Sequence, residues 1–455
     1  MDKAVIGNPA PQFLWQSRLS QGVFPLQCSS AVAENQPANK NRMTSGLSNF
    51  AARLREFILS EGRVPRGPDS ELQSLNGDSH SSSHRNDADF NEFALELFAL
   101  QFKYNAAYRK ICETRQLLPE GVEHWTQIPA VPAAAFKELE LTCLSRDERT
   151  AVFHSSGTTE QKPSRHFHSA ESLKSYDASL LTWFFENVLP DLRFTIYDLR
   201  LACLTPPPVH APHSSLVHMF ETVRQKIGAL ETVFVGKIAA DGSWTLDFNA
   251  VLAALSLGSQ TRDPRPHLLL GTAFSFVHLL DFLDEKNLRF DLPAGSRVME
   301  TGGYKNRSRS MPKVELHALI TERLGVPPEN IICEYGMSEL SSQAYAVTSD
   351  KWRVTREAAS SCHLSPVTCH FQFPPWSRVQ IISPETGREV AEGETGLIRV
   401  FDLANVFSVM AIQTEDLAIC HREGFELLGR APLAEPRGCS LMSHFALRTP
   451  HSALK

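Results

Sequence analysis

The chain lacks an excess of basic charge. Its 455 residues include 45 lysines and arginines against 51 aspartates and glutamates, for a formal net charge of -6. Proteins that bind nucleic acids in general neutralise phosphates with clustered basic residues, and this composition offers no such surplus. The balance argues against a general nucleic-acid binder. It leaves room for a local site that binds a small anion with a few donors.

Framework cysteine spacings and long apolar segments are also missing. The nine cysteines form no Cys-x-x-Cys pair, which favours reduced thiols over a disulfide scaffold. The longest apolar run, 268–283, contains His278 and Asp281 and is too short to span a membrane. Residues 1–42 show no compact apolar segment of the signal-peptide type. We therefore expect a soluble, cytoplasmic protein without a transmembrane segment.

A chain of 455 residues is too long for one ordinary domain. Composition and periodicity predict a helix over 49–59, a flexible insert over 61–86 and a single apolar-striped helix over 89–112. The expected organisation is a disordered tail (1–42), an N-terminal helix with the insert (43–88), an α/β core (89–370), a β-rich subdomain (371–430) and a short C-terminal segment (431–455).

The α/β prediction rests on a recurring pattern. A short apolar strand followed by a small-residue or glycine turn, and then by a helix-like stretch, occurs at 201–204, 268–271, 297–300 and 331–336. Such recurrence is typical of a parallel α/β sheet. Beyond about residue 370 the pattern changes to alternating strands at 378–382 and 396–401, which indicates the β-rich part.

The first candidate site is the segment 155–164, Ser-Ser-Gly-Thr-Thr-Glu-Gln-Lys-Pro-Ser. Its hydroxyl groups and backbone N–H groups can surround phosphate oxygens, and Lys162 adds a positive charge. A buried strand is predicted at 150–153 and an amphipathic helix at 170–189. A polar loop between a strand and a helix is where an α/β sheet places its ligand. On composition alone, an ordinary solvated turn is the alternative.

Three stretches together make the prediction specific. They are 155–164, Glu-Tyr-Gly-Met-Ser-Glu-Leu at 334–340, and Gln-Thr-Glu-Asp at 413–416 followed by Gly429-Arg430. In this order they resemble the adenylate-forming superfamily of acyl-CoA synthetases, adenylation domains and luciferases. Each stretch alone has an ordinary structural explanation, so their joint occurrence carries the resemblance.

Within that superfamily the chain is similar to the acyl-protein synthetase (LuxE-like) branch over about 93–442. The segments that carry this similarity are 128–132 with 135–137, 300–303, 401–405 and 434–439. The resemblance implies an adenylate-forming fold with layered α/β subdomains, a small β-rich subdomain and a truncated C-terminal region. It also implies ATP and Mg²⁺ as cofactors and a carboxylic acid of the fatty-acid class as the substrate.

The resemblance assigns roles residue by residue. Glu339 matches the magnesium-associated glutamate, and a carboxylate suits a hard cation. Asp416 matches the ribose-binding aspartate, and Arg430 lies at the hinge that follows. The residues expected to contact ATP phosphates are Ser155, Ser156, Gly157, Thr158, Thr159 and Lys162, and those expected around adenine are Gly302, Gly303, Tyr335 and Gly336. Lys162 and Glu339 are thereby candidate catalytic residues.

The resemblance further implies a thiol acceptor. In the acyl-protein synthetase branch, the acyl group passes to a cysteine near the C-terminus and then to a reductase partner. Cys439 is the last cysteine, and Arg437 nearby would favour its thiolate. We expect Cys439 to be catalytic and an acyl-accepting reductase or carrier protein to be the partner. A small buried hydrophobic residue is the alternative for Cys439.

The acyl pocket is expected near the Pro-rich turn at 206–208 and near Gly271. His213 and His218 are the candidates for contacting the substrate carboxylate, while ordinary packing is the alternative for the aromatic residues after Gly271. Glu160 stands where the family commonly has glycine. This departure leaves open a nucleotide- or acyl-binding module with lost chemistry, beside a CoA ligase resembling phenylacetate-CoA ligase. The pairs Cys362-His363 and Cys369-His370 do not have a standard zinc spacing.

Overall fold

The computed structural model describes residues 40–61, 82–155, 162–190, 199–229, 231–257, 265–302, 311–346, 370–422 and 424–431. By its contacts the chain divides into Met1–Arg42 and Met43–Lys455, and the contacts reported below lie within the second unit. Almost all of the predicted C-terminal segment (431–455) and of the predicted tail (1–42) lies outside the described residues. No helix in the described ranges is both long and apolar enough to cross a membrane.

The N-terminal helices differ in part from the prediction. Helix α1 (Lys40–Glu61) contains the helix expected at 49–59. Helix α2 (Ser82–Tyr104) begins inside the stretch predicted as an insert, of which 62–81 lies outside the described residues.

The single helix predicted over 89–112 is wrong, because the chain breaks at Asn105 between α2 and α3 (Ala106–Thr114). The Asn105 side chain accepts a hydrogen bond from the Tyr108 N–H at 3.0 Å, which caps the start of α3. Apolar spacing alone continues through such a cap and therefore misses the break.

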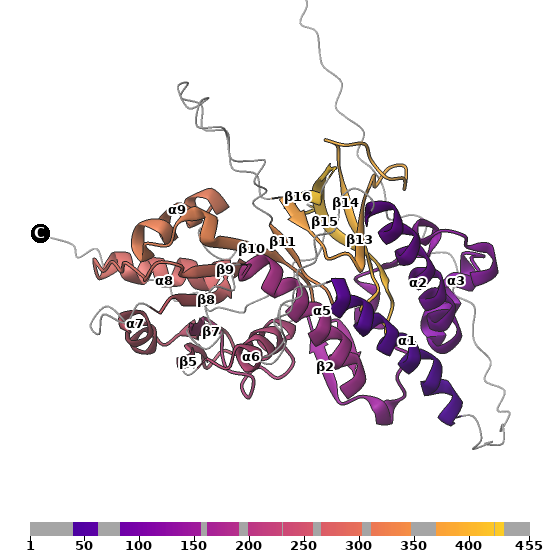
Figure 1. Cartoon of the computed structure of the whole chain (residues 1–455), viewed down its shortest axis with the longest axis horizontal. Coiled ribbons are helices and arrows are strands. Elements are labelled where there is room, and N and C mark those ends of the chain that lie inside the picture. Colours follow the sequence, from indigo (N-terminus) through magenta and orange to yellow (C-terminus); the bar gives the residue numbers. More distant parts are fainter. Residues whose placement is uncertain are drawn as a thin grey trace, which may run out of the picture. The chain divides into compact units, whose positions relative to one another are not determined.

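One 12-stranded sheet organises the fold, in the order β13-β14-β15-β16-β12-β11-β10-β9-β8-β4-β5, with β1 paired to β15 (Figure 1). Its parallel strands are β4 (Arg200–Cys203), β5 (Glu231–Phe234), β8 (His267–Thr272), β9 (Arg297–Thr301) and β10 (Ile331–Tyr335). Its antiparallel strands are β11 (Ala344–Ala346), β12 (His370–Gln372), β13 (Ser377–Ile382), β14 (Thr395–Asp402), β15 (Ala411–His421) and β16 (Gly424–Arg430). The two-residue strand β1 (Val131–Pro132) lies parallel to β15. The predicted α/β class is confirmed.

The connection between the parallel strands and the antiparallel strands of the sheet differs from the prediction. A helix was predicted after the strand at 331–336, but the chain turns into β11, which pairs antiparallel with β10. Strand β12 continues this pairing toward β16, so the β-rich part is hydrogen-bonded to the parallel part in one sheet.

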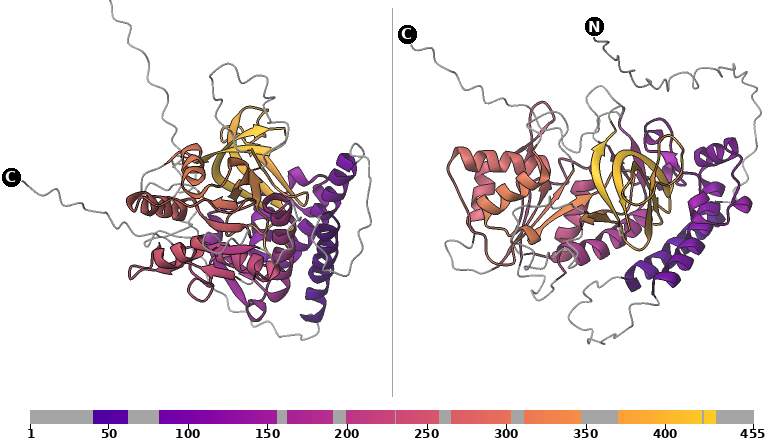
Figure 2. Two further views of the ribbon diagram at one scale, coloured as in Figure 1. Left: turned by 60° about the vertical axis from the view of Figure 1, so that its left-hand side comes forward. Right: turned by 90° about the horizontal axis from the view of Figure 1, so that it is seen from above.

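Helices cover both faces of the parallel strands (Figure 1, Figure 2). Leu269 of β8 packs with α7 (Phe248–Ser256), α8 (Ala273–Glu285) and α9 (Lys313–Leu324). Its neighbours Leu268 and Leu270 point to the opposite face, toward α5 (Ala170–Val188) and α6 (Ser215–Ile227). Strands buried on both faces read as continuous apolar runs, which explains the Leu-Leu-Leu sequence.

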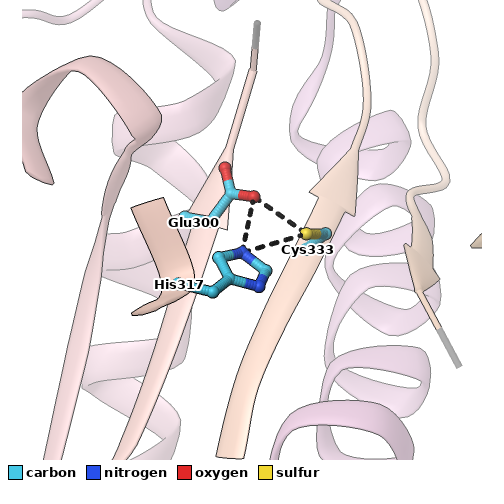
Figure 3. A group of neighbouring side chains, drawn as sticks. All are labelled: Glu300, His317 and Cys333. Carbon is cyan, nitrogen blue, oxygen red and sulfur yellow. Dashed lines mark hydrogen bonds and ion pairs between the residues drawn. The ribbon is translucent and has the colours of Figure 1, made fainter. Parts of the chain in front are cut away.

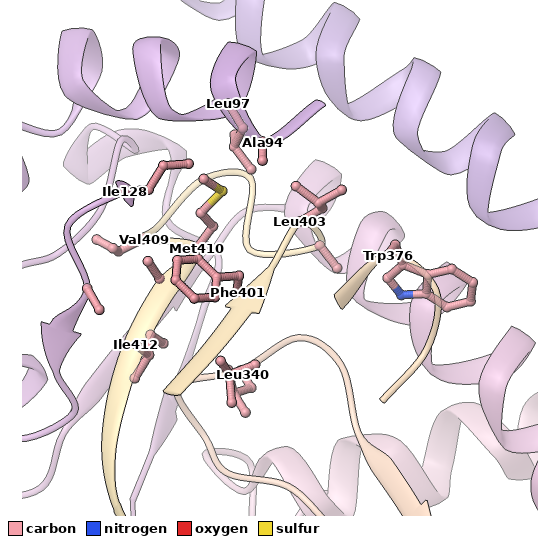
Figure 4. Packing of buried hydrophobic residues seen from close by; sticks show 14 of the residues in the cluster. Ala94, Leu97, Ile128, Leu340, Trp376, Phe401, Leu403, Val409, Met410 and Ile412 are labelled. Carbon is pink, nitrogen blue, oxygen red and sulfur yellow. The ribbon is translucent and has the colours of Figure 1, made fainter. Parts of the chain in front are cut away.

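The antiparallel half packs against the N-terminal helices (Figure 4). Leu97 of α2, Phe401 of β14 and Ile412 of β15 are fully buried in one cluster. Burying a side chain of this size contributes about 1.5 to 3 kcal/mol. Shorter elements complete the fold: α4 (Ala135–Glu138), the hairpin β6 (Gly236–Ile238) with β7 (Trp244–Leu246), and the 3-10 helices Pro119–Gly121, Trp125–Gln127, Arg146–Glu148 and Pro328–Asn330.

The predicted phosphate loop has an unexpected setting. It connects β2 (Ala151–His154) to β3 (Arg165–His168), which pair antiparallel as a separate two-stranded sheet. Helix α5 follows β3 and begins at Ala170, as predicted. The loop therefore joins two strands of a hairpin, and the expectation of a direct strand-to-helix turn is wrong.

Candidate active site

Several of the predicted site residues meet around the segment 335–339, at the end of β10. Gly336 comes directly after Tyr335, and a Cβ at this position would lie 2.4 Å from Glu334 Oε1, so only glycine fits without displacing that side chain. Glu334 is buried and accepts a hydrogen bond from Thr301 Oγ1. Burial raises the pKa of Glu334 to about 7, against the lowering effect of the Thr301 bond.

Tyr335, Asp416 and Arg430 lie together at one end of this segment. The Tyr335 hydroxyl donates to Asp416 Oδ2 at 2.9 Å, and Arg430 Nε lies 3.3 Å from Asp416 Oδ1. Strands β10 and β15 are four positions apart in the sheet, which corresponds to about 19 Å in a flat sheet. The sheet must therefore curl upon itself here, and the rings of Phe371 and Phe425 lie against Tyr335 inside the curl.

Glu339 lies at the other end of the segment. Its carboxylate is completely buried, and Oε2 accepts from the Ser338 hydroxyl at 3.0 Å. Ser338 Oγ also lies 3.5 Å from Ser164 Oγ. Ser164 closes the base of the phosphate loop, because its N–H donates to Ser155 Oγ at 3.0 Å. The structure thus brings the base of the loop next to the predicted magnesium ligand.

Two buried polar residues hold this arrangement from behind. Asn405 Nδ2 donates to the Glu339 carbonyl at 2.9 Å. Asp402 Oδ2 accepts from the backbone N–H groups of Ser341 and Ser342, both at 2.8 Å. The segment 401–405 carries part of the family similarity, but the sequence did not reveal these roles. The available signal in the sequence is one carboxylate, Asp402, and one amide, Asn405, inside an otherwise apolar run. Polar side chains in such a run are expected to be buried and to have hydrogen-bond partners.

His166 is a third residue whose role the sequence did not reveal. It is buried, and its Nδ1 lies 2.9 Å from the Ser338 carbonyl oxygen, to which it donates. Burial lowers the pKa of His166 to about 4, although the Ser338 bond and the Glu339 charge act in the opposite direction. His168 is also buried, with Nδ1 3.2 Å from Ser172 Oγ. In β3 the histidines face inward while Phe167 is half-buried, which inverts the usual hydrophobic alternation.

The glycines predicted on the adenine side are placed as follows. Gly302 follows β9 with a φ of 85°, a conformation that favours glycine. Gly271 lies within β8 and not in the turn that we expected, since the strand runs to Thr272 and α8 begins at once. A Cβ on Gly271 would approach Ser275 Oγ to 2.7 Å, so this position serves close packing between β8 and α8.

Three predicted residues make other contacts. Lys162 Nζ pairs with Glu138 at 3.1 Å, and both side chains are more than half exposed (52% and 70%), so this ion pair is weak. His213 is exposed, and its Nδ1 lies 3.2 Å from the Val152 carbonyl oxygen. His218 Nε2 lies 2.8 Å from Asp177 Oδ1. None of these three contacts involves Glu339. The remaining predicted residues, Ser156, Gly157, Thr158, Thr159, Gly303 and Cys439, lie outside the described residues, as does Glu160.

The donor set fits the chemistry that ATP and Mg²⁺ require. A buried carboxylate flanked by the Ser338 and Ser164 hydroxyls offers oxygen ligands, which hard cations prefer. Asp416 offers carboxylate oxygens suited to a diol, beside the aromatic ring of Tyr335. The geometry therefore places Glu339, the predicted metal ligand, and Asp416, the predicted ribose-binding residue, at opposite ends of the segment 335–339.

Comparisons with known proteins identify the family of the chain. The family model described as "Acyl-protein synthetase, LuxE" matches residues 73–447. A long-chain-fatty-acid–luciferin-component ligase of Vibrio harveyi is 24% identical over 362 residues, which cover 75% of this chain and 84% of that protein. The protein of the same name from Aliivibrio fischeri is 22% identical over 341 residues, covering 71% and 77%.

Among solved structures, the 2-hydroxyisobutyryl-CoA ligase in complex with 2-HIB-AMP and CoA matches with a TM-score of 0.54. The match covers 81% of this chain and 74% of that chain, at 14% identity. At this identity the likeness shows the fold, and it confirms the predicted adenylate-forming fold.

Proposed function

The chain belongs to the acyl-protein synthetase (LuxE) family, and we propose that it activates a fatty acid with ATP and transfers the acyl group to a thiol. The observation that carries this proposal is the placement of Asp416 and Glu339 at opposite ends of the segment 335–339, with the phosphate-loop base beside Glu339. A long-chain fatty acid is the proposed substrate class, because both curated relatives are long-chain-fatty-acid ligases by name.

In the first step a carboxylate oxygen of the fatty acid attacks the α-phosphorus of ATP. The bond from the α-phosphorus to its bridging oxygen breaks, so that pyrophosphate leaves and acyl-AMP remains. Glu339 would hold Mg²⁺, which when bound neutralises charge on the leaving pyrophosphate. Asp416 and Tyr335 would hold the ribose and adenine, fixing the α-phosphorus for in-line attack.

In the second step a thiolate attacks the acyl carbon, the bond from that carbon to the AMP oxygen breaks, and a thioester forms. We assign the first acceptor to Cys439 and the final acceptor to a reductase or carrier protein. We place the reaction in the cytoplasm. Among the described residues no two cysteines form a disulfide, which agrees with thiols kept in a reducing compartment.

Pyrophosphate release that depends on a fatty acid tests the first step. Glu339→Gln should lower kcat by about 100-fold or more, because removal of one electrostatic stabiliser of a phosphoryl transition state costs that much. The matched control is Glu385→Gln, which alters an exposed glutamate in the turn after β13 and should leave the rate unchanged.

Two outcomes would redirect the assignment. Multiple turnovers that require CoA would identify a CoA ligase resembling phenylacetate-CoA ligase. ATP binding without pyrophosphate release, across fatty acids of several chain lengths, would contradict the proposed reaction and support a binding module.

A further inference from the structure

A cluster of three potential metal ligands lies on the α9 face of the sheet (Figure 3). Glu300 comes from β9, Cys333 from β10 and His317 from α9. Cys333 Sγ lies 2.8 Å from Glu300 Oε1, and His317 Nε2 lies 3.4 Å from the same oxygen. The distance from Cys333 Sγ to His317 Nε2 is 3.6 Å. The three ligand atoms thus form a small triangle.

The triangle has nearly the size that zinc requires. Zinc lies about 2.0 to 2.1 Å from histidine nitrogen, about 2.3 Å from cysteine sulfur and about 2.0 to 2.2 Å from carboxylate oxygen. Tetrahedral angles then place two ligand atoms about 3.3 to 3.6 Å apart. Two sides of the observed triangle, 3.4 Å and 3.6 Å, match this spacing. Rotation of the Glu300 carboxylate lengthens the remaining side.

From this geometry we propose that Glu300, His317 and Cys333 bind one Zn²⁺ ion. The ligand types are those that zinc prefers, and three protein ligands leave a fourth position for water. All three ligands come from regular elements of the sheet and its covering helix, so their backbone positions are fixed before metal arrives.

The surroundings of Glu300 can accommodate the ion. Lys313 Nζ lies 2.8 Å from Oε1, while Oε2 is buried and has no hydrogen-bond partner within the described ranges. With zinc on Oε1, Lys313 can donate to Oε2 and keep the carboxylate oriented, as outer partners of metal ligands do. Lys313 is therefore already in position to orient the carboxylate of Glu300 when that carboxylate binds the metal.

An entry path exists on the α9 side. Glu300 and Cys333 are buried, but the side chains of His317 and Lys313 are 17% and 27% exposed. Binding replaces the Cys333 thiol proton with zinc, and that proton passes to the buffer. No oxidant or reductant takes part.

Cobalt(II) is the probe for this site, because a cobalt–thiolate bond gives a charge-transfer absorption band. The full chain, stripped with a chelator, should develop this band on titration with one equivalent of Co²⁺ and lose it when Zn²⁺ displaces cobalt. Cys333→Ser should abolish the band. Cys420→Ser, which alters a half-buried thiol outside the cluster, is the matched control and should retain it.

His317→Gln keeps the thiol and guards against a Cys333 variant that fails to fold. It should weaken cobalt binding by more than about 100-fold, beyond the loss expected from an outer partner. The second set of neighbouring ligands, His370, His421 and Glu426, contains no thiol and cannot produce the band. Absence of the band in the parent chain, or its survival in both Cys333→Ser and His317→Gln, would overturn the proposal.

Discussion

His166 connects the β2–β3 hairpin to the segment 335–339 through one hydrogen bond. Its Nδ1 donates to the Ser338 carbonyl, immediately before Glu339. A protonated imidazole would have to remain in an apolar setting, and burial is the largest cause of its lowered pKa. A neutral histidine therefore holds the carbonyl without adding a charge beside the buried Glu339 carboxylate.

This burial predicts sensitivity to acid. The pKa of His166 is about 4 in the folded chain, against an ordinary value of 6.5. As pH falls, the unfolded chain therefore takes up the His166 proton before the folded chain does. The contribution of neutral His166 to the free energy of unfolding is fully present above pH 6.5 and decreases as pH falls from 6.5 to 4. At pH 5 the decrease amounts to about 2 kcal/mol.

The variant His166→Asn retains a donor near Nδ1 and removes the titration. Urea unfolding at pH 7.5 and pH 5 should show a pH-dependent loss smaller by about 2 kcal/mol than in the parent chain. The exposed His210→Asn should behave like the parent. An unchanged pH dependence in His166→Asn would contradict the assignment.

At the level of elements, the turn after β14 holds the segment that carries Glu339. Asp402 is buried and accepts from the Ser341 and Ser342 N–H groups, while Asn405 donates to the Glu339 carbonyl. These bonds join β14 to the connection between β10 and β11. The antiparallel half of the sheet thereby positions a residue delivered by the parallel half.

Asp402→Asn places an amide N–H₂ group against a backbone N–H donor in either orientation, because Oδ2 accepts from the Ser341 and Ser342 N–H groups and Oδ1 accepts from the Ala404 N–H. We expect a loss of about 3 kcal/mol in the free energy of unfolding, since the amide keeps only one acceptor oxygen and leaves the buried donors at the other position unsatisfied. The matched control is Asp281→Asn on the exposed face of α8, which should change stability by less than about 0.5 kcal/mol. Denaturant unfolding of both variants measures the difference, and equal losses would contradict the role of Asp402.

At the level of the whole molecule, much of the fold could be predicted from the sequence. Apolar runs such as 268–270 predicted short strands of a parallel sheet, and β8 pairs in parallel with β4 and β9. Periodicity did not reveal the break at Asn105, because a buried cap interrupts a helix without interrupting its apolar stripe. It also missed β11 after Tyr335, since a three-residue strand leaves almost no pattern.

The site was predictable only where local chemistry is visible in the chain. Glu339 and Asp416 stand in recognisable motifs, whereas their proximity to Ser164 and Tyr335 depends on the hairpin and on the curl of the sheet. His166 could not be assigned from its neighbours, because its partner is 172 residues away in sequence. The Glu300–His317–Cys333 cluster is equally non-local, and no spacing rule for zinc ligands would find it.

The intact mass of the protein after incubation with Mg²⁺, ATP and a long-chain fatty acid tests the central claim most directly. The account predicts a mass increase equal to one acyl group, which requires ATP, disappears on treatment with hydroxylamine and is absent from Cys439→Ser. Cys420→Ser should still be acylated. Pyrophosphate release without any acyl adduct on the parent chain, or an adduct that persists in Cys439→Ser, would contradict the assignment of Cys439 as the acceptor.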